Sequence, residues 1–91
     1  MSALSQQVRI CNARGLHARA SAKLSKLAGS FRADVSLTRN GRRVTAKSIM
    51  GVMMLAAGIG TTVELETNGD QEQQAMDALV ALMNDKFGEG E

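Results

Sequence analysis

The chain has 91 residues, enough for one small hydrophobic core and too few for a two-domain enzyme with a cleft. Hydrophobic residues make up 44% of it, an ordinary share for a globular protein, although proline, tryptophan and tyrosine are absent. The formal net charge is +2, but all basic residues except Lys86 precede Ser48, and all acidic residues except Asp34 follow it. We therefore expect a basic surface at one end of the molecule that attracts an acidic partner.

Composition also restricts the compartment and the partners. A lone cysteine, Cys11, cannot form an internal disulfide, and residues 1–10 lack a signal-peptide pattern, so we expect a cytoplasmic protein. The longest apolar stretch, at 49–59, is too short to cross a bilayer, so we expect no membrane insertion. Two aromatic residues and no nucleic-acid motif argue against nucleic acid as a partner.

The predicted elements begin with a strand at 7–10, where apolar and polar residues alternate. A loop at 12–15 follows. Apolar residues then recur at helical spacing over 18–28, and Gly29 is expected to end that helix.

A hairpin is predicted next. Residues 31–38 alternate between apolar and polar, which is typical of a strand with one solvent-exposed face. Residues 42–46 are predicted to form the return strand. Asn40-Gly41 between them is a dipeptide that favours the positive φ angles of a two-residue turn.

The second half predicts a helix, a strand and a helix. Ser48 can cap a short helix that runs to about residue 55, and residues 61–67 alternate as a fourth strand. An apolar stripe at helical spacing over 75–87 indicates a third helix, with acidic Asp70 and Glu72 at its start.

These elements predict an α+β open-faced sandwich with the order β-α-β-β-α-β-α. Half-polar strands favour a four-stranded antiparallel sheet, and the three helices can cover its apolar face. We expect a single domain over 1–91, monomeric, with a frayed tail at about 88–91. No P-loop and no metal-ligand pattern occur in the sequence, so we expect neither a cofactor nor a metal.

His17 is the only histidine and directly precedes a predicted helix. The backbone N–H groups of Ala18 and Arg19 lack partners within that helix, so they can bind an anion held on the imidazole. The Arg19 guanidinium adds a charge suited to phosphate oxygens. Neutral imidazole is a competent nucleophile at neutral pH, and the phosphoramidate it forms can release the group again, so the pattern favours a phosphoryl carrier.

Two segments make this hypothesis specific. Residues 12–19 (NARGLHAR) resemble the active-site signature of HPr phosphocarriers of the bacterial phosphotransferase system, and residues 47–51 (KSIMG) resemble their regulatory-serine region. The resemblance covers nearly the whole chain. It implies that His17 is phosphorylated on Nδ1 with Arg19 as its charge partner, and that the protein is a carrier rather than an enzyme.

The same resemblance implies the partners. Enzyme I would charge the protein from phosphoenolpyruvate, enzyme IIA-type proteins would discharge it, and an HPr kinase/phosphorylase could modify Ser48. One residue departs from the family pattern, because Ala20 stands where proline is usual. Alanine is an excellent helix former, so we expect the helix to survive and only the rigidity of the loop to change.

Ser48 and its neighbours allow two interpretations. Ser48 is either a helix N-cap only or also a site of regulatory phosphorylation beside the docking surface. Too many apolar side chains occupy this short segment for all of them to be buried, so we expect some to face a partner. The predicted docking residues are Lys23, Ile49, Met50 and Met53, with Met54 a further candidate.

Two other functions stay open. The chain could be a regulatory module that docks effectors without carrying phosphate, although HPr-like proteins of that kind generally lack the histidine. It could also be a structural α+β subunit in which His17 merely caps a helix. The sequence does not distinguish a sugar-transport carrier from a nitrogen-related one.

Overall fold

The structure, a computed structural model, describes residues 3–91 and has four strands in one antiparallel sheet of order β1-β4-β2-β3. The strands are β1 (Leu4–Arg9), β2 (Asp34–Arg39), β3 (Arg42–Thr45) and β4 (Thr62–Asn68). The helices are α1 (Ala18–Gly29), α2 (Ile49–Met53) and α3 (Glu72–Asn84), followed by a 3₁₀ turn, η1 (Lys86–Gly88). The predicted α+β open-faced sandwich and its element order are confirmed, with η1 as an addition.

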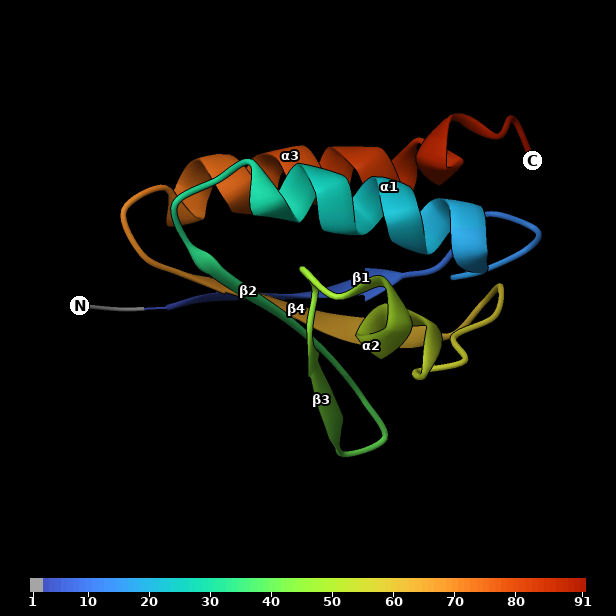
Figure 1. The fold of residues 1–91 in the computed structure, drawn as a ribbon. Helices are drawn as coiled ribbons and strands as arrows, with labels where there is room; N and C mark the ends of the chain where they lie inside the picture. Colours follow the sequence, from blue (N-terminus) through green and yellow to red (C-terminus); the bar gives the residue numbers. More distant parts are fainter. Residues whose placement is uncertain (1–2) are drawn as a thin grey trace.

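The helices cover one face of the sheet (Figure 1). The long helices α1 and α3 lie side by side above it, while the short α2 packs against α1 and the edge strand β3. The core lies between the layers and contains Leu24 of α1, Leu79 of α3, and Leu37 and Leu65 of the central strands, all fully buried. Alternation along the strands therefore produced the expected two-sided sheet.

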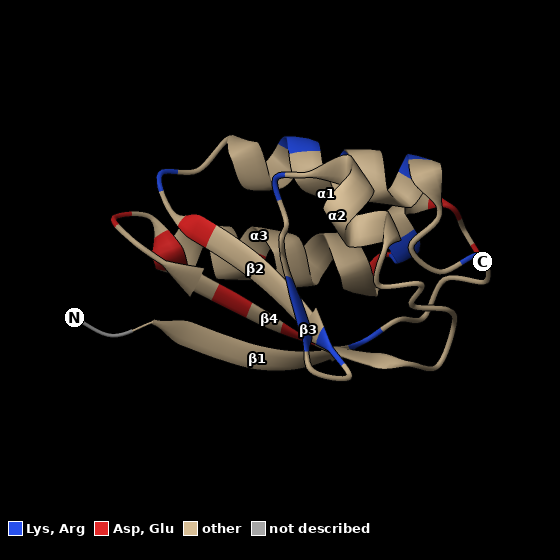
Figure 2. Cartoon of the chain, turned by 60° about the horizontal axis from the view of Figure 1, so that its bottom comes forward, with Lys and Arg blue, Asp and Glu red and all other residues tan. Residues whose placement is uncertain are grey.

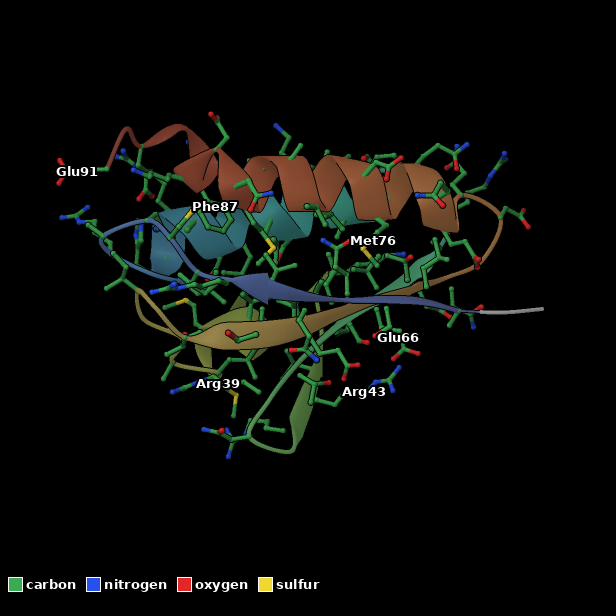
Figure 3. The ribbon with its side chains drawn as sticks, turned by 180° about the vertical axis from the view of Figure 1, so that it is seen from behind. Arg39, Arg43, Glu66, Met76, Phe87 and Glu91 are labelled. Carbon is green, nitrogen blue, oxygen red and sulfur yellow. The ribbon has the colours of Figure 1, made fainter. Side chains whose placement is uncertain are left out.

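The opposite face of the sheet is polar. Glu66 of β4 lies opposite Ser36 and forms an ion pair of 3.1 Å with Arg43 of β3, and Figure 3 shows these two side chains pointing toward each other. Ser5 of β1 donates to Glu64 at 2.7 Å. Cross-strand polar pairs of this kind suit a face in contact with water.

The Asn40-Gly41 hairpin turn forms as predicted, whereas the end of α1 at Gly29 differs from the prediction. Asn40 and Gly41 have φ angles of 52° and 79°, as the predicted two-residue hairpin requires. Gly29, however, does not end α1 through a left-handed conformation. It is the last helical residue, and Ser30 closes the helix by donating from Oγ to the carbonyl of Leu27 at 2.6 Å.

The C-terminal segment differs most from the prediction. The third helix was expected to continue to Phe87, but α3 ends at Asn84, and Lys86 and Phe87 take φ angles of 56° and 55°. These residues turn the chain back, so that Phe87, only 1% exposed, points into the interior (Figure 3). A frayed tail was expected over residues 88–91, whereas the backbone carbonyl of Glu91 accepts from Ala13 N–H at 2.9 Å. The tail is held because Phe87 anchors the segment before it.

Candidate functional site

His17 occupies the N-cap position of α1. Its backbone is extended, with φ −76° and ψ −178°, and its side chain makes no capping hydrogen bond. The imidazole is 23% exposed, so a partner protein can reach it. The interpretation of His17 as a mere helix cap therefore has no support in its contacts.

The first turn of α1 points unused donors toward this end of the helix. Within the described residues, the backbone N–H groups of Ala18 and Arg19 have no hydrogen-bond partner. The first hydrogen bond of the helix is made by Ser21 N–H, which donates to the carbonyl of His17 at 2.8 Å. Free N–H groups and the positive end of the helix dipole together favour an anion. Ala20, which stands where the family usually has proline, is fully buried within α1, and the helix is intact there, as expected.

The loop that carries His17 is fixed by its backbone. Leu16 N–H donates to the carbonyl of Ala57 at 2.9 Å, and buried Asn12 donates from Nδ2 to the carbonyl of Gly15 at 2.9 Å. Gly15 has φ +64° and lies directly against the backbone after α2. A side chain there would collide with that backbone, so glycine is required for both its conformation and its size.

Glu89 is the residue at this site that the sequence did not indicate. Its Oε2 lies 2.6 Å from His17 Nε2, and its Oε1 accepts from Asn12 Nδ2 at 3.0 Å. The hydrogen bond from Asn12 lowers the pKa of Glu89; partial burial opposes this effect, and His17 and Lys23 add to it. The only signal in the sequence for this contact was an acidic residue two positions after Phe87, the last apolar residue of the predicted third helix.

An open cavity of about 510 Å³ is lined in part by Glu89, the carboxylate that contacts His17. Its lining residues are Arg14, Arg19, Lys23, Gly88, Glu89 and Glu91. We call it the basic cavity, because three cations from the loop and α1 meet there; Figure 2 shows basic segments beside the acidic C-terminal tail. Lys23, predicted to dock partners, also donates from Nζ to the carbonyl of Phe87 at 2.7 Å, so its ammonium already holds the tail.

Exposed apolar side chains gather on and after α2. The predicted docking residues Ile49, Met50 and Met53 are 44%, 68% and 38% exposed. Two others, both 59% exposed, extend the set: Met54 and Ile59. We call these five residues the apolar patch. Ile59, which lies between two glycines, was missed because neither strand nor helix periodicity marks it.

Comparison with known proteins identifies the family. The family described as "PTS HPr component phosphorylation site" matches residues 4–85. The chain belongs to the HPr family. It is 66% identical to phosphocarrier protein HPr of Cupriavidus necator over 88 residues, which is 97% of this chain and 99% of that protein.

Two further similarities agree with the HPr family. Phosphocarrier protein NPr of Shewanella violacea is 42% identical over 89 residues, 98% of each chain. The crystal structure of HPr-C-His from Thermoanaerobacter tengcongensis superposes with a TM-score of 0.91 at 40% identity, covering 94% of this chain and 97% of that one. Membership makes this protein a phosphoryl carrier of the phosphotransferase system, not a catalytic enzyme.

Two side chains of this HPr-family protein form hydrogen bonds with the backbone of the α2 region, one at the start of the helix and one just after its end. Ser48 is its N-cap, as predicted, and accepts from Gly51 N–H at 3.0 Å. Arg39 reaches across from β2 and donates from Nη1 to the carbonyls of Leu55 and Ala56, at 2.8 and 3.2 Å (Figure 3 labels Arg39). The role of Arg39 was not predicted, because it depends on a contact between distant segments.

Residues 3–91 contain no group of three or more His, Cys, Asp or Glu side chains arranged to hold a metal ion. None of the helices in this part of the chain is both long enough and apolar enough to cross a membrane.

Proposed function

We propose that His17 accepts a phosphoryl group on Nδ1 from enzyme I and donates it to enzyme IIA-type acceptors. The observation that carries the proposal is the position of His17 at the start of α1, beside the unpaired N–H groups of Ala18 and Arg19. Unpaired N–H groups at a helix start favour an anion, so they can hold the oxygens of a phosphoryl group on the imidazole.

The transfer needs no cofactor. The Nδ1 lone pair bonds to phosphorus, the bond between phosphorus and the donor protein breaks, and its electron pair stays with the donor. Delivery reverses the step: a nucleophile of the acceptor bonds to phosphorus, and the N–P electron pair returns to Nδ1. Arg19 supplies charge to the phosphoryl oxygens in both directions, since its guanidinium is permanently protonated.

Docking of both partners is assigned to the apolar patch and the basic cavity. The patch is apolar and contains three methionines, whose flexible side chains suit a surface that meets several partners. The cavity supplies Arg14, Arg19 and Lys23, which attract an acidic partner surface. Phosphorylation of Ser48 by an HPr kinase/phosphorylase would add negative charge beside the patch and weaken that docking.

The test is phosphorylation in a reconstituted system. Purified protein is incubated with enzyme I and phosphoenolpyruvate, and intact-mass spectrometry at mildly alkaline pH follows the gain of one acid-labile phosphoryl group. The wild type is expected to gain it, His17→Ala to remain unmodified, and the control Ser48→Ala to behave as wild type. An unmodified wild type, or a modified His17→Ala, would overturn the proposal.

A further inference from the structure

We propose that Glu89 is a positioning residue for phosphoryl transfer: its carboxylate holds the Nε2 proton of His17 and so presents Nδ1 with a free lone pair. The proposal rests on the function assigned above to His17. It concerns a residue of the C-terminal tail, two positions after the buried Phe87, that does not touch phosphorus in the proposed step.

Glu89 Oε2 lies 2.6 Å from His17 Nε2. An ionised carboxylate has only acceptor atoms, so a hydrogen bond this short requires that Nε2 carries the proton. A neutral imidazole has a single N–H, and the proton on Nε2 therefore leaves the lone pair on Nδ1. Within residues 3–91, Nδ1 has no hydrogen-bond partner that would compete for this lone pair.

Glu89 is itself held in place. Its second oxygen accepts from Asn12 Nδ2, and Asn12 is fully buried and bonded to the loop carbonyl of Gly15. The Glu89 side chain is only 12% exposed. Asn12 therefore connects the carboxylate to the same loop that positions His17, so the distance between carboxylate and imidazole is set by the fold rather than by a free tail.

The contact also helps after the phosphoryl group arrives. When Nδ1 bonds to phosphorus, the ring becomes an N-phosphorylated imidazolium, and its remaining proton stays on Nε2 against the Glu89 carboxylate. The negative charge compensates the ring charge that develops during the step. Arg14, Arg19 and Lys23 line the same cavity as Glu89. Their positive charges offset the electrostatic repulsion between the Glu89 carboxylate and the incoming phosphoryl group.

The experiment compares Glu89→Ala, Glu89→Gln and the matched control Asp85→Asn, which removes a carboxylate four residues away. Asp85 is exposed and is not among the residues that line the basic cavity. Nitrogen-15 NMR of the imidazole reports the tautomer, and the initial rate of His17 phosphorylation at subsaturating enzyme I reports reactivity. Melting temperatures are measured alongside.

The wild type is expected to show mainly the Nε2–H tautomer. Glu89→Ala should show mixed tautomers and a rate lower by about tenfold, since one charge-assisted hydrogen bond is lost. Glu89→Gln keeps one acceptor where the carboxylate offers two, to Asn12 and to His17, so it should recover the tautomer and the rate only in part. The control Asp85→Asn should match the wild type in both measurements.

Different failures have different meanings. A reactive wild type whose Glu89→Ala variant keeps the same tautomer and rate would overturn the positioning role alone. An equal loss of rate in Asp85→Asn would also overturn it, because the effect would then be general to negative charge in the C-terminal segment. A wild type that never gains the phosphoryl group would overturn the proposed function, and the role of Glu89 in it.

Discussion

The backbone N–H of Leu16 donates to the carbonyl of Ala57 at 2.9 Å and joins the loop of His17 to the chain that leaves α2. Figure 1 shows the start of α1 and the segment that follows α2 at the same end of the molecule. Because this bond joins the two segments, changes at the junction should affect both.

Gly15→Ala tests that junction. A Cβ at this position would overlap the Ala57 carbonyl and lie 2.8 Å from Gly58 Cα, and φ +64° is unfavourable for alanine. We expect a loss of about 1–3 kcal/mol in the free energy of unfolding from the backbone conformation, a further loss from the overlap, and slower phosphorylation of His17. Urea denaturation measures the first two effects.

The matched control is Gly41→Ala. Gly41 also has positive φ, +79°, but a Cβ there meets nothing within 4 Å. It should therefore lose only the conformational part and react at the wild-type rate. Equal losses of stability in the two variants would mean that the loop does not pack against the Ala57 backbone as described.

Acidification should weaken the hydrogen bonds that the Glu89 carboxylate accepts. The pKa of Glu89 is lowered below its ordinary value of 4.5, so the folded state favours the ionised carboxylate. The stabilisation is therefore fully present above the ordinary pKa and is lost as pH falls through the lowered value. NMR titration of the Asn12 side-chain amide should detect the loss, since this amide donates to Glu89.

The control for the titration is Glu89→Gln, which has no carboxyl group at this position. The Asn12 amide should then show no transition in that acidic range. A transition that persists unchanged in Glu89→Gln would assign it to another group, such as the Glu91 carboxyl in the same cavity.

Met50→Asp tests docking by the apolar patch. Met50 is 68% exposed, so the change should alter the free energy of unfolding by no more than about 0.5 kcal/mol. It should weaken enzyme I binding by about tenfold or more, because an apolar contact is replaced by a charge that repels an acidic surface. Titration calorimetry measures the affinity, and circular dichroism confirms the fold.

Gln74→Asp supplies the same charge change elsewhere. Gln74 is exposed near the start of α3, at the opposite end of the molecule from His17. Its affinity for enzyme I should equal that of the wild type. If both variants bind equally well, the apolar patch is not the docking surface.

Ser48 variants should rank differently in stability and in rate. Ser48→Ala loses the cap bond to Gly51 N–H and about 0.5–2 kcal/mol of stability, whereas Ser48→Asp keeps an N-cap acceptor. For His17 phosphorylation the order reverses: Ser48→Asp should be slow, because its charge opposes the partner, and Ser48→Ala should react at the wild-type rate. Equal rates for the two variants would leave Ser48 with its capping role only.

The sequence by itself determined the elements, their order and the position of the proposed nucleophile. Alternation over 31–38 and 61–67, the Asn40-Gly41 turn and the Ser48 cap are local signals, because each depends on neighbours within a few residues. The motif around His17 was equally readable, since the helix that begins at Ala18 supplies its unused donors from adjacent residues.

The tertiary structure alone decided what lies against His17. Phe87 continued a helical stripe in sequence, and nothing local indicated that Lys86 and Phe87 would turn the chain in the left-handed region, where residues with a Cβ are rare. That turn is stabilised by burial of Phe87 and by its carbonyl accepting from Lys23, on a helix distant in sequence. Because such contacts form only when α1 and α3 are packed together, the bond between Glu89 and His17 appears only in the folded protein.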